Sequence, residues 1–172
     1  MDSRAYKVLI ADDDSGIRDL LTTLLSMKGH VCESAVDGRE ASEKMGRGQF
    51  DAVITDVLMP RKDGMALAKE LLEKNPLLPV MIMTGYLDRY SIKDAMSMGV
   101  SDFITKPFHP KDFFLRFDRM MLDRDVNVRI QECEKELETI AAEMMAHGGK
   151  DSEKKILALQ EEIMMLRKHV GH

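Results

Sequence analysis

Five short apolar segments recur along the N-terminal two thirds of the chain, and they restrict the fold more than any other feature. The segments at residues 6–11, 52–55 and 80–84 are apolar almost without interruption, and those at 31–35 and 102–105 are more mixed. A strand that is buried on both faces has an uninterrupted apolar pattern, whereas a strand with one exposed face alternates. The pattern therefore predicts a parallel sheet that is covered by helices on both faces.

The segments between the strands have helical periodicity, as at Leu20, Leu21, Leu24 and Leu25. Five alternations of strand and helix predict an α/β domain over residues 1–122, with a flavodoxin-like doubly wound (βα)5 parallel sheet in the order 2-1-3-4-5. In such a sheet the carboxyl ends of the strands line the crevice where ligands bind.

Composition and charge limit the classes of partner that the chain is expected to bind. The 172 residues leave room for one domain and an appendage, and the formal net charge of −5 argues against a broad nucleic-acid surface. No apolar run approaches the ~20 residues that span a bilayer. Cys32 and Cys133 have no metal-ligand spacing. We expect a cytoplasmic protein with no membrane partner and no direct nucleic-acid partner.

Acidic side chains follow two strands that the expected order makes neighbours. Asp12 and Asp13 come after the first strand, and Asp56 comes after the third. Three carboxylates that converge on one crevice repel each other unless a cation lies between them. Mg²⁺ is usually coordinated by few protein oxygens, and water molecules fill its remaining coordination positions. The sequence therefore predicts a Mg²⁺ site.

A hydroxyl and an ammonium group reach the same edge of the expected sheet, because Thr84 ends the fourth strand and Lys106 ends the fifth. A metal ion and a lysine can neutralise the charge on a transferring phosphoryl group. A carboxylate, here Asp56, can be the nucleophile that forms an acyl phosphate.

This set of residues resembles the receiver domain of bacterial two-component response regulators over about residues 5–122. The resemblance implies that Asp56 accepts a phosphoryl group from a sensor histidine kinase. It also implies that Asp12, Asp13 and Asp56 hold Mg²⁺ together with the backbone carbonyl of Leu58. The TGY motif at 84–86 and the segment 95–108 resemble receivers of the nitrogen-regulator type.

The resemblance assigns further roles near the phosphoacceptor. Lys106 is expected to bind the phosphoryl group and to precede a cis proline, Pro107. Thr84 is the expected switch hydroxyl, with Phe103 at the aromatic switch position that is usually Tyr in the family. Such a domain is a phosphoacceptor and not an enzyme, apart from catalysing its own phosphorylation and dephosphorylation.

Two positions depart from the polar residues that help water to attack the acyl phosphate in this family. They are Leu58, two residues after Asp56, and Tyr86, two residues after Thr84. Leucine cannot orient water and a tyrosine ring can shield the phosphoryl group, so we expect a long-lived phosphoaspartate.

Other residues have structural interpretations. Asp14 is expected to begin or cap the first helix. Phe113 and Phe117 have the spacing of a buried helix face. The five histidines do not cluster, and we expect them to be surface or capping residues, with His109 capping a helix that begins at Pro110.

Residues 123–172 are expected to form helices at about 124–147 and 152–170, joined by a turn at Gly148-Gly149. Apolar residues recur in steps of three and four on each side of the glycines. One interpretation is an antiparallel hairpin with these facing layers: Cys133 with Val170, Leu137 with Leu166, Ile140 with Ile163 and Met144 with Leu159. The other is a continuation of the fifth helix that pairs in parallel with a second subunit.

The sequence thus predicts a two-component response regulator that signals by protein contact or oligomerisation, including homodimerisation through the C-terminal helices. The segment after residue 122 is short and acidic, so no DNA-binding output domain is expected in it. The alternatives are a phosphorelay intermediate, and the receiver portion of a larger ATPase-type regulator or hybrid kinase. The kinase, the stimulus and the target do not follow from the sequence.

Overall fold

The computed structural model describes residues 4–85, 92–147 and 150–170, and the chain divides into two compact units, Met1–Met120 and Met121–His172. The strands are β1 (Lys7–Ala11), β2 (Val31–Ala35), β3 (Ala52–Asp56), β4 (Val80–Thr84) and β5 (Asp102–Thr105). The helices are α1 (Ser15–Met27), α2 (Gly38–Arg47), α3 (Gly64–Lys74), α4 (Ile92–Ser97), α5 (Pro110–His147) and α6 (Lys150–Val170).

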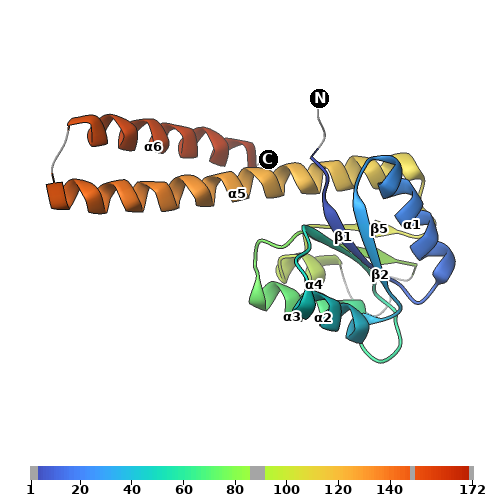
Figure 1. Ribbon diagram of the computed structural model, residues 1–172. Coiled ribbons are helices and arrows are strands. Elements are labelled where there is room, and N and C mark those ends of the chain that lie inside the picture. The colour runs from blue at the N-terminus through green and yellow to red at the C-terminus, as the bar shows by residue number, and fades with distance from the viewer. Residues whose placement is uncertain (1–3, 86–91, 148–149, 171–172) are drawn as a thin grey trace. The chain divides into compact units, whose positions relative to one another are not determined.

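The first unit contains one parallel sheet with the strand order β2-β1-β3-β4-β5 (Figure 1). The register pairs Ala11 with Thr55, Asp56 with Met83, and Thr84 with Thr105. The ends of β1, β3, β4 and β5 therefore lie at the same edge of the sheet. The expected doubly wound α/β fold and its strand order are confirmed.

The three central strands, β1, β3 and β4, are buried on both faces because they are almost continuously apolar. Leu9, Val53 and Ile82 face one layer of helices, in a core with Leu67, Ala68 and Leu71 of α3. The alternate strand positions Val8, Ile10, Ile54, Met81 and Met83 are fully buried as well. Phe113 and Phe117, which begin α5, are fully buried, as the helical spacing predicts. Packing on two faces holds the strand ends in a fixed frame.

Aspartate side chains begin three of the helices at this edge. Asp14 accepts a hydrogen bond from the Gly16 amide at 2.7 Å, Asp37 caps α2, and Asp63 accepts from the Ala66 amide at 2.7 Å. A carboxylate at this position satisfies a free helical N–H and interacts favourably with the helix dipole. The predicted cap at Asp14 is confirmed. His109 caps α5 as expected, because its Nδ1 accepts from the Lys111 amide at 3.2 Å.

The histidine at residue 30 is not on the surface, contrary to the prediction. His30 is only 8% exposed, and its ring lies 5.3 Å from the rings of both Tyr6 and Phe117. Its Nδ1 accepts a hydrogen bond from the Tyr6 amide at 3.3 Å. Burial lowers the pKa of His30, against the opposing charge of Asp118. The short turn between α1 and β2 places His30 under α5, and sequence spacing does not reveal this neighbour.

The second unit is a pair of helices from one chain, and it differs from the prediction in two ways. The first helix does not begin near residue 124, because α5 is continuous from Pro110 to His147. The second helix begins at Lys150, two residues before the expected start at about 152, and α6 packs along α5 (Figure 1). The Gly148-Gly149 turn itself lies outside the described residues. The unit thus combines the continued fifth helix of one interpretation with the antiparallel hairpin of the other.

The apolar seam of the hairpin contains the residues that the spacing predicts. Ile130, Cys133, Ile140, Leu159 and Ile163 are buried, and Val126, Leu137, Ile156 and Leu166 pack around them. Arg129 pairs with Glu162 at 2.8 Å, and Arg167 pairs with Glu134 at 2.6 Å. These exposed pairs add little to the free energy of unfolding, so the seam is what holds the two helices together.

The predicted register of the seam is wrong by about one heptad. The Arg129–Glu162 ion pair places Cys133, one helical turn further along α5, close to the Ile163 layer. The predicted partner Val170 lies outside the described side chains. Apolar spacing repeats every seven residues and therefore allows several registers. The short connection between His147 and Lys150 selects the one in which layers close to the turn face each other.

No helix in the described ranges is both long enough and apolar enough to cross a membrane. The long helix α5 carries charged side chains throughout its length.

The buried His30 predicts a pH-dependent stability. Because its folded-state pKa lies below the ordinary value of 6.5, its contribution is present above pH 6.5 and is lost as the pH falls toward the folded-state pKa. Urea unfolding followed by circular dichroism should show a loss of stability between pH 7.5 and pH 5.5. His30→Gln keeps an acceptor for the Tyr6 amide but does not titrate, so the loss should be smaller. An equal loss in both proteins would contradict the assignment.

Candidate functional site

The candidate site lies at the edge of the sheet where β1, β3 and β5 end. The Lys106 ammonium, one residue past β5, lies 2.6 Å from Asp12 Oδ2 and 2.5 Å from Asp56 Oδ1. Asp12 is fully buried and Asp56 is 6% exposed. One positive charge therefore bridges two buried carboxylates that the chain places 44 residues apart in sequence.

Asp56 is held in place by the residues that follow it. Its Oδ2 atom accepts a hydrogen bond from the Leu58 amide at 2.6 Å, while Oδ1 faces Lys106. Burial raises the pKa of Asp56, and the nearby Asp12 raises it further, against the opposing effects of Lys106 and the Leu58 amide. The carboxylate is thus fixed in orientation while one cation only partly offsets its burial.

The Lys106 ammonium keeps its charge although it is half buried. Burial by itself lowers the pKa of a lysine, but the hydrogen bonds to Asp12 and Asp56 outweigh that effect and raise the pKa of Lys106. The Lys106 backbone amide also donates to the Thr84 carbonyl at 2.7 Å. The peptide bond between Lys106 and Pro107 is cis, as predicted.

Asp12 and Asp13 occupy different environments although they are adjacent. The Asp14 amide donates to Asp12 Oδ1 at 3.0 Å, whereas the Asp13 side chain is exposed. The Arg18 guanidinium donates to the carbonyls of Asp12 and Asp13 at 2.8 and 3.0 Å, and so fixes the turn after β1. No sequence signal identified Arg18, because its role depends on the direction of the first turn of α1.

The two proposed switch residues lie on neighbouring strands. Thr84 is the last residue of β4 and is 4% exposed, one position beyond the partner of Asp56 in the register. Phe103, on β5, is partly buried against the core, and the Arg116 guanidinium lies 5.8 Å from its ring centre. The structure thus brings Thr84 to the same edge as Asp56, with Phe103 on the adjacent strand.

The structure describes one of the two residues that depart from the family pattern. Leu58 is 45% exposed, and it contacts Asp56 through its backbone amide. Tyr86 lies outside the described residues.

Gly64 is a site residue that the sequence reasoning missed. Its amide donates to the Val57 carbonyl at 2.9 Å, and a Cβ at this position would overlap the carbonyl oxygen of Asp56. The first turn of α3 therefore packs directly against the backbone of the candidate phosphoacceptor. The Asp63-Gly64 pair signals a turn, but only the fold shows that the turn meets Asp56.

The oxygen donors at this edge fit the chemistry of Mg²⁺. Within the described residues, no three Asp, Glu, His or Cys side chains form a closed metal-binding group. The Lys106 ammonium lies between Asp12 and Asp56. A closed group is not required, because Mg²⁺ usually keeps several water molecules and binds one or two carboxylates. The raised pKa of Asp56 also indicates a carboxylate whose burial is not fully compensated.

Residues 8–118 match the family model of the response regulator receiver domain. The match covers more than half of the chain and includes every element of the site described above. The chain belongs to the response regulator receiver family.

The relatives are longer proteins. The chain is 37% identical over 101 residues to the DNA-binding transcriptional regulator NtrC of Escherichia coli strain K12, a match that covers 59% of this chain and 22% of NtrC. It is 32% identical over 118 residues to the response regulator MprA of Mycolicibacterium vanbaalenii, which covers 67% of this chain and 50% of MprA. The chain thus spans no more than half of these relatives.

A similar solved structure is the response regulator protein TrrA from Thermotoga maritima in complex with Mg²⁺-BeF. It has a TM-score of 0.62 and 26% identity, and the match covers 67% of this chain and 98% of that one. This similarity supports the receiver fold.

The close packing at Gly64 predicts a large effect of one methyl group. Gly64→Ala should destabilise the protein by about 1–3 kcal/mol, because the backbone of Asp56 has to move. Gly46→Ala is the matched control, since nothing lies within 4 Å of the added atom and alanine favours a helix by about 1 kcal/mol. Urea unfolding of both variants tests this, and equal midpoints would contradict it.

Proposed function

We propose that Asp56 accepts a phosphoryl group from a sensor histidine kinase, and that the chain signals through protein contact. The observation that supports this most strongly is the ammonium of Lys106 between the buried carboxylates of Asp12 and Asp56. A lysine in this position can neutralise the charge on the oxygens of a phosphoryl group during transfer. The fixed orientation of Asp56 by the Leu58 amide leaves Oδ1 as the nucleophile.

Asp12, Asp13, Asp56 and the Leu58 carbonyl would hold Mg²⁺, which supplies further charge neutralisation during phosphoryl transfer. Within the chain, Asp12 and Asp56 share the ammonium of Lys106 before transfer. A phosphoryl group on Asp56 adds negative charge next to Lys106 and draws it away from Asp12. The local charge change then biases a conformational equilibrium.

Thr84 and Phe103 are the proposed elements of that equilibrium. Thr84 is placed at the end of β4 to hydrogen-bond a phosphoryl oxygen, and Phe103 is partly buried on the next strand. Movement of Thr84 toward Asp56 would leave space for the Phe103 ring, which changes the surface formed by α4, β5 and the start of α5. Phe103 has no hydroxyl, so its effect is one of packing alone.

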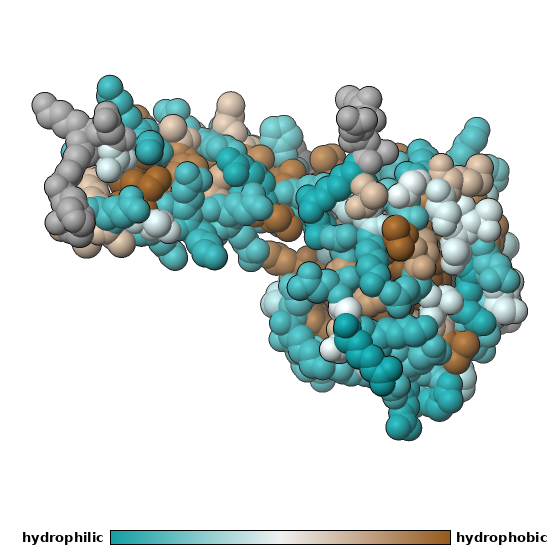
Figure 2. All heavy atoms as spheres, viewed as in Figure 1, coloured by the Kyte–Doolittle hydropathy of each residue, from teal (hydrophilic) through white to brown (hydrophobic). Residues whose placement is uncertain are grey.

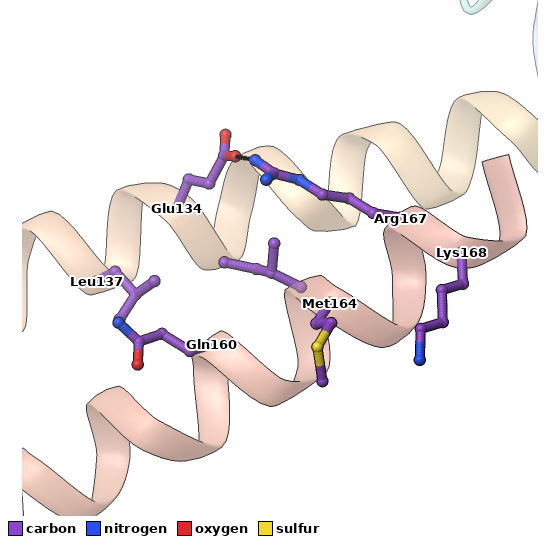
Figure 3. Close-up of a pocket in the computed structure, with 7 residues that line it drawn as sticks. Glu134, Leu137, Gln160, Met164, Arg167 and Lys168 are labelled. Atoms are coloured by element: carbon purple, nitrogen blue, oxygen red, sulfur yellow. Dashed lines mark hydrogen bonds and ion pairs between the residues drawn. The ribbon is translucent and has the colours of Figure 1, made fainter. Parts of the chain in front are cut away.

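The hairpin is the proposed output element of this chain. Its surface carries exposed apolar side chains, visible as brown spheres among the teal ones (Figure 2), and they include Leu157, Met164 and Met165. A groove on one side is lined by Leu137, Gln160, Met164 and Lys168, beside the Glu134–Arg167 ion pair (Figure 3). A two-helix unit has one thin seam, and a second copy that forms a four-helix bundle would cover this surface.

Phosphorylation should depend on Asp56 and on Lys106. Asp56→Ala should abolish labelling by a phosphoramidate donor with Mg²⁺, because the nucleophile is gone. Lys106→Ala should slow labelling by about 100-fold, the effect of removing one charge-stabilising donor. Phosphate-affinity electrophoresis measures both, and unchanged circular dichroism controls for the fold. Labelling of Asp56→Ala at the wild-type rate would contradict the assignment.

The phosphoaspartate should be long-lived, because Leu58, two residues after Asp56, has no polar group that can orient water. Leu58→Asn should shorten its half-life by about tenfold, less than the ~100-fold that an aligned general base supplies. The measurement is the decay of the phosphorylated band after removal of the donor. A wild-type half-life of seconds or less with Mg²⁺ would contradict this prediction.

Oligomerisation can be followed by light scattering with Mg²⁺ alone and with Mg²⁺ plus beryllofluoride. If the hairpin joins two activated copies, the mass should double with beryllofluoride in the wild type and not in Asp56→Ala. A constant mass in the wild type would contradict phosphorylation-dependent dimerisation.

A further inference from the structure

The loop of residues 57–63 connects β3 to α3 and carries the residue that binds the candidate phosphoacceptor. Its first part is tied to the site, since the Leu58 amide donates to Asp56 Oδ2 at 2.6 Å. Its far end meets the N-terminus of α2, which is not part of the site. The position of Leu58 therefore depends on what fixes the rest of the loop.

Arg61 has an unusual backbone within this loop. Its φ is +64°, and it is the one non-glycine residue with positive φ in the described part of the chain. This left-handed conformation is unfavourable for a residue with a Cβ atom, and it persists only where surrounding contacts impose it. The contacts of the loop therefore offset the cost of this backbone conformation, which sets the direction of the Arg61 side chain.

That direction brings the guanidinium of Arg61 to Asp37. The Asp37 side chain is fully buried, and its Oδ1 atom caps α2 by accepting from the amides of Arg39 and Glu40 at 2.8 and 2.9 Å. The Oδ2 atom forms an ion pair with Arg61, and no hydrogen-bond donor among the described residues satisfies it otherwise. A buried carboxylate is costly without a charge partner, so Asp37 holds Arg61 firmly.

A second contact joins the same two elements. The Gly38 amide donates to the Lys62 carbonyl at 3.1 Å, and a Cβ on Gly38 would lie 2.6 Å from that oxygen. The Lys62 ammonium in turn donates to Ser42 at 2.9 Å and pairs with Glu70 of α3. The start of α2 is thus clamped against the end of the loop.

We propose that the Asp37–Arg61 ion pair is a latch that positions the Leu58 backbone at Asp56, which makes Arg61 and Asp37 positioning residues for phosphorylation. This inference rests on the proposed function for the role of the Leu58 carbonyl as a Mg²⁺ ligand. Arg61 is three residues from Leu58 and touches neither Asp56 nor the metal position. Release of the latch should loosen the Leu58 amide from Asp56 and weaken Mg²⁺ binding.

The test compares the wild type with Arg61→Gln, Asp37→Asn and the double variant. Asparagine caps a helix as well as aspartate does, so Asp37→Asn keeps α2. Arg39→Gln is the matched control, because Arg39 is an exposed arginine at the same helix end and its side chain pairs with Glu43, at 3.5 Å, and not with Asp37. Amide hydrogen exchange without metal is measured by two-dimensional NMR, with the Val53 amide of β3 as the reference for global unfolding.

We expect exchange of the Leu58 amide to become about tenfold faster relative to Val53 in both single variants, with no further increase in the double variant. The Mg²⁺ dissociation constant, from titration of the same spectra, should rise about tenfold, the lower end of the effect of residues that support metal ligands. Arg39→Gln should leave both quantities unchanged. Arg61→Gly, which removes the backbone strain as well as the latch, should weaken Mg²⁺ binding to the same extent.

Three results would overturn the latch. They are an unchanged Leu58 exchange rate in Arg61→Gln, an equal acceleration of Leu58 and Val53, and additive effects in the double variant. The proposed function fails in a different way. If the wild type binds no Mg²⁺ while Leu58 exchange still responds to Arg61, the latch stands and the metal site is wrong.

Discussion

The site depends on one interaction, the ammonium of Lys106 shared by Asp12 and Asp56. Two carboxylates are buried at one edge of the sheet, and without a cation between them one would be driven toward protonation. The lysine arrives from the fifth strand, far from both carboxylates in sequence. The ammonium reaches both carboxylates only if the strands of the parallel sheet are in register. The geometry of the site therefore depends on the packing of the buried core.

The loop that follows Asp56 is the second constraint. Its backbone is closed at Gly64, which has no room for a side chain, and turned at Arg61, which has a positive φ. Both features set the path of the loop backbone, and neither Gly64 nor Arg61 supplies a reactive group. They explain how one short loop can present an amide to Asp56 Oδ2 while its far end is fixed on α2. A site of this kind is preorganised by its supporting contacts.

Much of the site could be predicted because the ends of the strands can be located from the sequence. Apolar runs predict buried strands, and the polar residue after each run is then placed at a common edge. Asp12, Asp56, Thr84 and Lys106 were found in this way, and the structure brings them to one edge of the sheet. Gly64, Arg61 and Arg18 were missed, because each acts through contacts with backbone or with an element distant in sequence. The burial of His30 was missed for the same reason, since α5 covers it.

The fold, its strand order and the family follow from the amino-acid sequence alone, because periodic burial and the residues at strand ends are local signals. The same holds for the apolar seam of the hairpin, which its spacing of three and four predicts. The unbroken course of α5 from Pro110 to His147 and the position of Cys133 beside the layer of Ile163 depend on tertiary contacts. A heptad pattern is unchanged by a shift of seven residues, so its register depends on the length of the connection between the helices. The pairing of Asp37 with Arg61 is likewise a matter of which loop the fold brings to which helix.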